Sequence, residues 1–514
     1  MSLARERGMT AGGSVLFLTV LGTLSQLLGF GYRVALSRMV GAEVMGLYQL
    51  IMPVYSVLLS LTAVGLTAAV SNLTPQYLAL GNSRGIPQLL GTCLKILFLL
   101  MVPISAVVLL CYDPISVYWL GDARTQLGLI LLLPCVALTG VENLHKHFFY
   151  GSSLVRPPAV AELLEQLVRT GAVLGLLAYF LPQYPERVVG LIVAGMVICE
   201  VASAVTLTVL CRWRLHRMGL KGPGEPGRVR RRRVFSIALP VGLNALLGNL
   251  MGAVNAALVP QKLVEGGMDP SQAISELGVV CGMTLPMLSL PIVFLGAINL
   301  VLAPRLARAC ALNRREEVRR LVSRAAEAVC LLALPAMALM VVVGPDLGRV
   351  LFHQAGVGEY LVPLAAATAM GCLCSVLSAA LNAVGEQRAV AAISLLGGAV
   401  QLAFTLALVP RPGVGMAGFV AGAVASGGLE LALCLWWTAR RTGLRPPLFR
   451  WLAAPGLASL LAGLTSNLLF RVLKDAGLAP VPAGLAALAF FLVLYLSALQ
   501  AQGVEARAFL RALR

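Results

Sequence analysis

The sequence predicts an all-α polytopic membrane protein, and three observations lead to that class. Hydrophobic residues make up 59% of the 514 residues, charged residues only 12%, and the mean hydropathy is +0.87. A soluble core cannot hide so much apolar surface. Apolar runs of roughly 20 residues recur, the length that crosses about 30 Å of hydrocarbon at 1.5 Å per residue. Lys and Arg lie mainly between these runs, as they do at the ends of membrane-spanning helices.

Hydropathy predicts about fourteen membrane-spanning helices. They lie at residues 13–37, 46–70, 91–112, 127–149, 159–181, 188–211, 234–259, 278–303, 325–344, 360–384, 390–409, 415–438, 452–472 and 482–502. The first run is followed by another span instead of a small-residue cleavage site and a polar domain, so we expect it to stay in the protein.

A basic stretch rich in Gly and Pro divides the chain into two halves. We predict an N-terminal six-helix lobe at 1–211, a basic cytoplasmic linker at 212–233, a C-terminal six-helix lobe at 234–438, and two additional helices with a cytoplasmic tail at 439–514. An approximate repeat supports this division, because Pro53, the second span and the segment after it match Pro286, the eighth span and its following segment. The pattern predicts lobes related by a parallel pseudo-two-fold repeat, with the substrate path between them.

Basic residues concentrate in alternate loops. Residues 212–233 contain nine Lys or Arg, residues 305–324 contain seven and residues 440–450 contain four, whereas the opposite loops carry scattered single charges. The positive-inside rule therefore places both termini in the cytoplasm. Because the net charge of +18 gathers at helix ends, we expect the basic loops to bind anionic membrane lipids and not nucleic acid.

The sequence argues against a membrane enzyme. The loops on the outer side are short, and none assembles a nucleophile, a base and an orienting acid. A Walker-type phosphate loop is also absent from the sequence, so transport would not use ATP on this chain. We expect no cofactor, and we expect any transport to be coupled to a Na⁺ or H⁺ gradient or to the membrane potential.

Metal binding is not expected either. The eleven cysteines lie mostly inside apolar runs and lack CxxC spacing, so we interpret them as small core residues. Glu142, His145 and His147 have a spacing that could bind zinc, which stays a minor alternative.

Arg33 and Arg38 are the unusual residues of the first span. An arginine at the centre of a bilayer costs about 2.5–3.5 kcal/mol on insertion scales, so it needs a polar cavity or a path to the interface. One interpretation is that these side chains reach the outer membrane interface along the helix. The alternative is that they face the cleft and bind an anionic pyrophosphate, for which a guanidinium offers a bidentate fit.

A second charged cluster is predicted at the cytoplasmic ends of the fourth and fifth spans. It comprises Glu142, Lys146, Arg156, Glu165 and Arg169. Glu165 and Arg169 are four residues apart and can form an ion pair along one helix face. The structural interpretation is such a pair, whereas the functional one is a polar wall that receives a sugar-phosphate headgroup, with Lys146 and Arg156 contacting the phosphate.

The remaining candidates are amides and isolated carboxylates. Asn244 and Asn255 lie in the seventh span, where their amides could bind sugar hydroxyls or form hydrogen bonds between helices. Glu200 and Glu430 each lie alone inside an apolar span, so both are candidates for proton or sodium coupling.

Four segments carry a resemblance to a known family: residues 28–66, 156–169, 257–294 and 381–387. With them the chain resembles the stage V sporulation protein B branch of the multidrug/oligosaccharidyl-lipid/polysaccharide exporter superfamily, which also contains the lipid II flippases. In those flippases, two arginines of the first helix line a cationic cavity. Gln26 and Tyr32 take these positions here, and Arg33 follows one residue later.

The resemblance implies fourteen helices in two lobes, alternating access, and flipping of a polyprenyl-pyrophosphate-linked saccharide across the bacterial cytoplasmic membrane. It further implies that the saccharide is a peptidoglycan precursor, with a link to the spore cortex and to wall-synthesis proteins. Two other functions stay open from the sequence. One is a cation-coupled exporter of small molecules with the same fold, and the other is a non-transporting scaffold of the wall-synthesis machinery.

Overall fold

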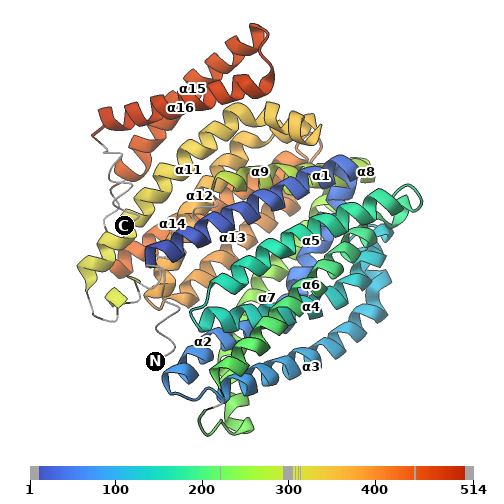
Figure 1. The fold of residues 1–514 in the computed structure, drawn as a ribbon. Coiled ribbons are helices and arrows are strands. Elements are labelled where there is room, and N and C mark those ends of the chain that lie inside the picture. The colour runs from blue at the N-terminus through green and yellow to red at the C-terminus, as the bar shows by residue number, and fades with distance from the viewer. Residues whose placement is uncertain are drawn as a thin grey trace. The chain divides into compact units, whose positions relative to one another are not determined.

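The computed structural model describes residues 11–503 except 220, 293–301, 303, 304, 307, 311, 313, 445, 446 and 448. Within these residues the protein is built of helices and contains no strand (Figure 1). The chain forms two compact units, one ending at Gln261 and the other beginning at Lys262.

The first helix, α1 (Ala11–Leu59), holds two of the predicted spans. Its 49 residues would extend about 74 Å as one straight rod, far more than a bilayer needs. The rod is broken at Gly41, where φ is 78° and ψ is 179°, a backbone conformation that residues with a side chain rarely adopt. Figure 1 shows the ribbon turning back there. The second span then continues through a π-helical turn, η1 (Ser60–Val64), into α2 (Gly65–Ala79).

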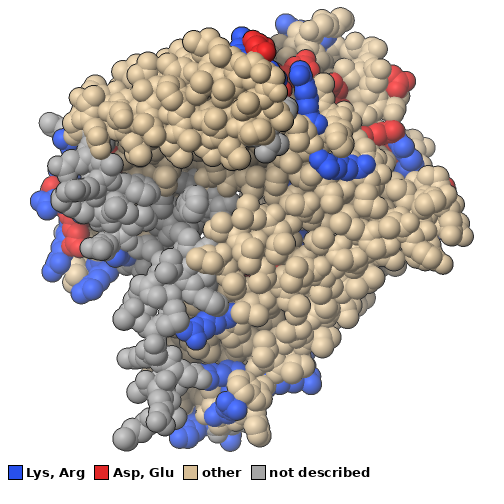
Figure 2. All heavy atoms as spheres, turned by 45° about the horizontal axis from the view of Figure 1, so that its top comes forward, with Lys and Arg blue, Asp and Glu red and all other residues tan. Residues whose placement is uncertain are grey.

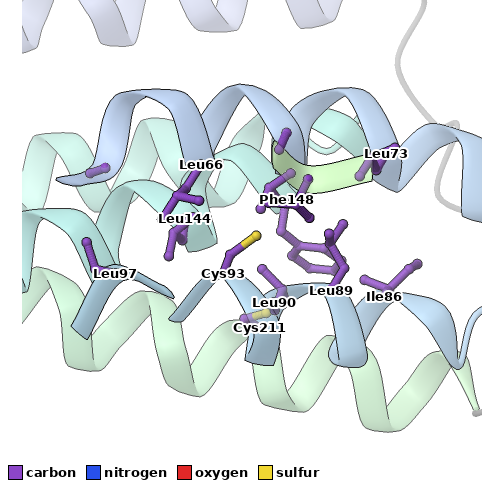
Figure 3. Packing of buried hydrophobic residues seen from close by; sticks show 14 of the residues in the cluster. Leu66, Leu73, Ile86, Leu89, Leu90, Cys93, Leu97, Leu144, Phe148 and Cys211 are labelled. Atoms are coloured by element: carbon purple, nitrogen blue, oxygen red, sulfur yellow. The ribbon is translucent and has the colours of Figure 1, made fainter. Parts of the chain in front are cut away.

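Five further long helices follow α2 in or at the edge of the first unit. They are α3 (Gly85–Pro114), α4 (Gln126–Gly151), α5 (Arg156–Phe180), α6 (Val188–Met218) and α7 (Gly227–Glu265), with short turns η2 (Ile115–Trp119), η3 (Ala123–Thr125) and η4 (Pro185–Arg187). Apolar side chains of α2, α3, α4 and α6 form the buried core shown in Figure 3, with Leu66, Leu89, Leu144 and Phe148 at its centre. Cys93 and Cys211 are part of this core, as predicted for small apolar residues.

The second unit contains the remaining helices. They are α8 (Pro270–Leu277), η5 (Gly278–Thr284), α9 (Leu285–Ser289), η6 (Leu290–Ile292), α11 (Arg315–Phe352), η7 (Ala355–Gly358), α12 (Leu361–Ala383), α13 (Gln387–Leu408), α14 (Met416–Thr442), η8 (Phe449–Ala453), α15 (Ala454–Asp475) and α16 (Pro480–Ala501). Helices α15 and α16 pack on each other and on α11, with Phe491 and Tyr495 in the contact.

The described residues include 13 helices that are long and apolar enough to cross a membrane. Each of the fourteen predicted spans overlaps one of them, because the first two spans share the segment Val20–Ala79. The eighth prediction, 278–303, lies partly outside the described residues. Large apolar side chains such as Leu99, Leu110 and Leu468 are exposed, and Figure 2 shows a face made mostly of uncharged side chains. Such a surface suits contact with lipid.

The connection between α6 and α7 is shorter than the linker predicted at 212–233. Residues up to Met218 continue α6, and α7 begins at Gly227, so that only residues 219–226 lie between them. The boundary between the two compact units also falls after Gln261 in the chain and not inside this stretch. The physical reason is that α7 packs against the first unit. A side chain at Gly65 would collide with the carbonyl of Ala238, and Asn249 Nδ2 donates to Ser60 Oγ at 2.6 Å.

The prediction that both termini lie in the cytoplasm concerns residues 1–10 and 504–514, which are outside the described residues.

Candidate functional site

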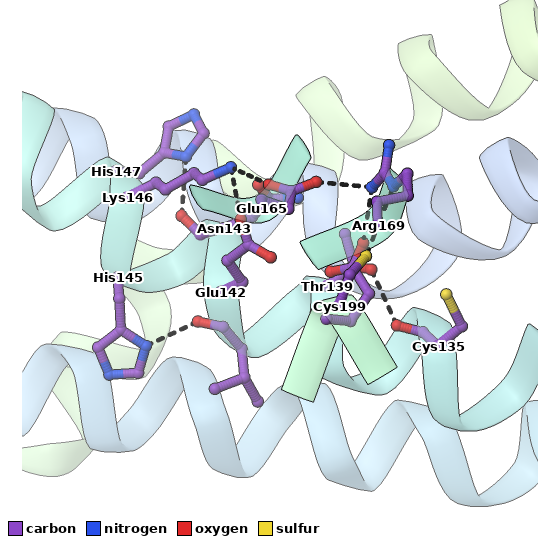
Figure 4. A network of polar contacts seen from close by, with 12 residues as sticks. Cys135, Thr139, Glu142, Asn143, His145, Lys146, His147, Glu165, Arg169 and Cys199 are labelled. Carbon is purple, nitrogen blue, oxygen red and sulfur yellow. Dashed lines mark hydrogen bonds and ion pairs between the residues drawn. The ribbon is translucent and has the colours of Figure 1, made fainter. Parts of the chain in front are cut away.

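Charged side chains from three helices of the first unit form one continuous chain of ion pairs (Figure 4). Lys146 of α4 pairs with Glu142 one turn earlier and with Glu165 of α5, where Nζ and Oε2 are 3.1 Å apart. Arg169 Nη2 lies 2.6 Å from Glu165 Oε1 and 3.3 Å from Glu200 Oε1 of α6. We call these five residues the charged cluster.

Two features bring these groups together: the helical repeat, which places residues four apart on one face, and close packing between helices. Glu142 and Lys146 on α4, like Glu165 and Arg169 on α5, are four residues apart and so share a helix face. Gly195 allows α5 and α6 to approach, since a Cβ at this position would lie only 2.8 Å from Val173 Cα. The two helix faces therefore meet at the level of Arg169 and Glu200.

Burial differs between the acids and the bases of the charged cluster. The side chains of Glu142 and Glu200 are each 2% exposed and that of Glu165 is 10% exposed, whereas Lys146 is 14% and Arg169 21% exposed. The cations are thus the most accessible members, and the carboxyl groups lie behind them. An anion that reached the charged cluster would meet Lys146 and Arg169 first.

Tyrosines of α1 cover another side of the charged cluster. Tyr32 is buried and lies near Arg169, Cys199 and Tyr48. Arg169 Nε also donates to Cys199 Sγ at 3.4 Å. The hydroxyl of Tyr32 has no hydrogen-bond partner among the described residues. Neither Tyr32 nor Cys199 was a predicted site residue, because the sequence does not show which face of α1 or α6 turns inward.

The structure places Arg33 and Arg38 outside the charged cluster. Both are exposed, whereas Tyr32, Leu36 and Ser37 beside them are buried. Five residues of α-helix separate the two arginines by about 140° around the axis, so they leave α1 on different sides. The helix therefore presents Tyr32 to Arg169 and turns Arg33 away from that core.

Arg156 lies away from the charged cluster along α5. It is exposed at the first residue of α5, nine residues before Glu165, or about 14 Å along the helix. The predicted set of Glu142, Lys146, Arg156, Glu165 and Arg169 thus splits: four members meet, and Arg156 lies at the helix end.

Glu200 and Glu430 were both predicted to be isolated carboxylates. The structure corrects this prediction for Glu200 and leaves it open for Glu430. The sequence treats Glu200 as an isolated carboxylate, but the structure pairs it with Arg169 through packing of α5 on α6. Glu430 lies in α14 of the second unit, where its side chain rests on Gly397 of α13 and leaves no room for a side chain there.

The amide side chains of α7 are spread along the helix. Asn244 is exposed and Asn255 is half-buried. Asn249, which lies between them, donates from Nδ2 to Ser60 Oγ and, at 3.3 Å, to the Ser56 carbonyl. This contact fits the interpretation of amides as links between helices.

A metal site is not supported by these groups. His145 Nδ1 lies 2.7 Å from the Val141 carbonyl and His147 Nδ1 lies 2.9 Å from the Asn143 carbonyl, so each ring is bonded to its own helix. Figure 4 shows the two rings pointing apart. Glu165, Cys199 and Glu200 do approach one another, but the Arg169 guanidinium already contacts all three.

Comparison with known proteins identifies relatives over most of the chain. The family model described as polysaccharide biosynthesis protein matches residues 12–310, and the model described as lipid II flippase MurJ matches residues 282–472. Stage V sporulation protein B of Bacillus subtilis (strain 168) is 25% identical over 406 residues, which are 78% of this chain and 78% of that protein.

Solved structures show the same fold. An inward-facing multidrug resistance MATE family transporter of the MOP superfamily has a TM-score of 0.66 at 14% identity, covering 82% of this chain and 94% of that one. The lipid II flippase MurJ in an inward closed conformation has a TM-score of 0.65 at 11% identity, covering 94% of this chain and 98% of that one. At these identities the likeness concerns the fold alone.

Proposed function

Because the chain belongs to the polysaccharide biosynthesis protein family, we propose that it is an ATP-independent flippase for a polyprenyl-pyrophosphate-linked saccharide. It is a transporter and not an enzyme, and it works in the bacterial cytoplasmic membrane by alternating access, with both termini in the cytoplasm. Its substrate is a peptidoglycan precursor, and the spore cortex is the candidate destination. The similarity to stage V sporulation protein B and the match to the lipid II flippase model support this choice.

The charged cluster is the single observation on which the proposed substrate class depends. Two cations, Lys146 and Arg169, are held inside an apolar helix bundle and are more accessible than the carboxylates that pair with them. A guanidinium and an ammonium together suit a phosphate or pyrophosphate group. We therefore assign headgroup binding to the charged cluster. Arg33, Arg38 and Arg156 then serve as interfacial contacts on the way to it, and Asn244 and Asn255 as candidate saccharide contacts.

Energy for transport is proposed to come from an ion gradient or the membrane potential. Glu200 in the first unit and Glu430 in the second are the candidate coupling carboxylates, since both lie in membrane-spanning helices. The basic loops bind anionic lipids, and wall-synthesis proteins are the proposed protein partners.

One experiment tests the flippase proposal directly. Depletion of the protein should raise the fraction of lipid-linked precursor in the inner leaflet, measured by leaflet-specific labelling. Re-expression of the wild type should restore the distribution, whereas Arg169→Ala at matched membrane levels should not. An unchanged leaflet distribution after depletion would overturn the proposal.

A second candidate function is that of a cation-coupled exporter of small molecules with the same fold. The TM-scores to the multidrug transporter and to the lipid II flippase are nearly equal, at 0.66 and 0.65. For such an exporter, cells that lack the protein would become sensitive to small-molecule drugs while their precursor distribution stayed normal. A scaffold would instead tolerate charged-cluster substitutions and fail when its basic loops are deleted.

A further inference from the structure

The charged cluster contains more acids than bases. Glu142, Glu165 and Glu200 face Lys146 and Arg169, so complete ionisation would leave one uncompensated negative charge in a largely buried site. A buried unpaired charge is strongly unfavourable in a low dielectric, and a carboxyl group avoids that cost by binding a proton. Charge balance alone therefore assigns one proton to the three carboxyl groups.

Geometry indicates where that proton lies. Glu142 and Glu200 are the most deeply buried carboxyl groups of the charged cluster, with side chains that are each 2% exposed. Among the described residues, no donor reaches Oε2 of Glu142 or Oε2 of Glu200. The cost of an unpaired charge is highest at these two groups, so the proton is assigned to one of them, at the deepest part of the charged cluster.

The groups that surround the charged cluster are mostly uncharged, and the additional cation near them, Arg33, is exposed beside Tyr32 and Tyr48. The remaining neighbours are Tyr32, Tyr48 and Tyr55 of α1, Cys135, His147 and Tyr150 of α4, Glu162 of α5 and Cys199 of α6. The additional carboxylate, Glu162, is exposed to solvent, so it needs no compensation inside the bundle.

Glu165 forms ion pairs with both cations, and a bound anion would compete with it for both. Its Oε2 contacts Lys146 and its Oε1 contacts Arg169, and no other ion pair is recorded for it among the described residues. An incoming phosphate would meet these more accessible cations and draw them away from Glu165. The buried Glu165 carboxylate would then lack compensation, which a second proton supplies.

We propose that the charged cluster binds a phosphate-class anion and a proton together, with Glu165 as the group that takes up the proton when Lys146 and Arg169 turn to the anion. This inference rests on the proposed function only in naming the lipid pyrophosphate as the natural anion. Because linkage is reciprocal, the anion binds more tightly where the proton concentration is higher and leaves where it is lower.

Proton counting with the purified full-length protein tests the proposal. Inorganic pyrophosphate is titrated calorimetrically near pH 7 in two buffers that differ in ionisation enthalpy, and the difference in heat gives the protons taken up. The wild type should take up about one proton per pyrophosphate beyond the exchange that pyrophosphate itself undergoes. Affinity should then rise close to tenfold for each unit by which the pH is lowered.

Two variants separate this role from a structural one. Glu165→Gln removes the carboxylate that Lys146 and Arg169 share and leaves each cation with one charged partner, Glu142 or Glu200. The variant should therefore bind pyrophosphate at least as tightly as the wild type and lose the extra proton. This variant also measures the protons exchanged by pyrophosphate alone. Glu162→Gln, an exposed glutamate on the same helix, should behave like the wild type.

Several results would overturn the proposal: no pyrophosphate binding by the wild type, binding without proton uptake, or uptake that persists in Glu165→Gln. If Glu165→Gln does not fold, the pH dependence of wild-type affinity still decides the question. The leaflet-labelling experiment is independent of this one. A protein that flips precursor without proton linkage would contradict only this inference, and one with proton linkage but no flipping would contradict only the proposed function.

Discussion

At the scale of single residues, Arg169 holds the charged cluster together. Its guanidinium contacts Glu165, Glu200 and Cys199, which come from two different helices. The i,i+4 pair of Glu165 and Arg169 follows from the sequence, because helical period places the two on one face. The contact with Glu200 does not, because it depends on how α6 is rotated against α5.

Replacing this arginine should be costly for folding. Arg169→Ala leaves Glu165 and Glu200 without their shared cation, and breaking a buried ion pair on one side costs about 3–5 kcal/mol. Thermal unfolding followed by size-exclusion chromatography in detergent measures the loss. Arg33→Ala is the matched control, because Arg33 is exposed on α1 and should change stability by less than about 0.5 kcal/mol. Equal effects of the two substitutions would contradict the role given to Arg169.

At the scale of elements, the connection between α6 and α7 is docked on the loop between α2 and α3. Ser83 Oγ donates to the Gly219 carbonyl at 2.7 Å, and Arg84 N donates to the Lys221 carbonyl at 3.0 Å. Glu225 accepts from Tyr77 and from Arg233, whose Nη1 lies 2.9 Å from Oε1. The Gly and Pro content predicts a flexible linker, whereas these long-range contacts, which composition cannot indicate, hold it in place.

The docking of this connection should weaken in acid. Partial burial raises the pKa of Glu225. The hydrogen bonds from Tyr77 and Arg233 lower it by more, so that the pKa lies below its ordinary value of 4.5. A folded-state pKa below the unfolded one gives stabilisation that is complete above pH 4.5 and is lost as the pH falls through the folded-state value. Hydrogen exchange of the amides of residues 219–226, corrected for intrinsic pH dependence, should report this loss.

A substitution separates the effect of Glu225 from general acid unfolding. Glu225→Gln should expose Lys221 to trypsin faster than the wild type at neutral pH, because the amide replaces a carboxylate that accepts from Arg233. Glu186→Gln, an exposed glutamate of another loop, should leave cleavage unchanged. Unaltered cleavage in Glu225→Gln would show that the other hydrogen bonds suffice.

The crossing of α2 and α7 is the second feature at this scale. A Cβ on Gly65 would collide with the Ala238 carbonyl, so α7 approaches α2 closely only because this position has no side chain. Gly65→Ala should therefore destabilise the protein by about 1–3 kcal/mol through overpacking. Gly91→Ala in α3, where a Cβ would meet nothing within 4 Å, should instead gain about 0–1 kcal/mol from helix propensity. Thermal unfolding of both variants measures the difference.

At the scale of the whole molecule, the question is which residues move as one body during transport. The sequence repeat predicts that α7 belongs to the C-terminal lobe, whereas the compact units assign residues up to Gln261 to the first unit. Contacts at Gly65, at Asn249 and at Gln261, whose Nε2 donates to the Trp119 carbonyl at 2.6 Å, lie along nearly the full length of α7.

A crosslink decides between these assignments. Ser60→Cys and Asn249→Cys place two thiols where the native side chains form a 2.6 Å hydrogen bond, and a short bifunctional thiol reagent can join them. If α7 moves with the first unit, the crosslinked protein should retain leaflet transport of precursor, with both single-cysteine variants as controls for the reagent. Loss of transport only in the crosslinked double variant would assign α7 to the second moving body.

The sequence by itself determined the class of the protein, its membrane-spanning segments and the pairing of charges within one helix. These features depend on apolar runs and on helical period, which are local and do not require neighbours. Tertiary structure decided that Tyr32 and not Arg33 faces the charged cluster, that Glu200 joins it, and that Gly219, Lys221 and Glu225 are docked. Each of these depends on how one helix is rotated and shifted against another, and that is set by packing between residues far apart in the chain.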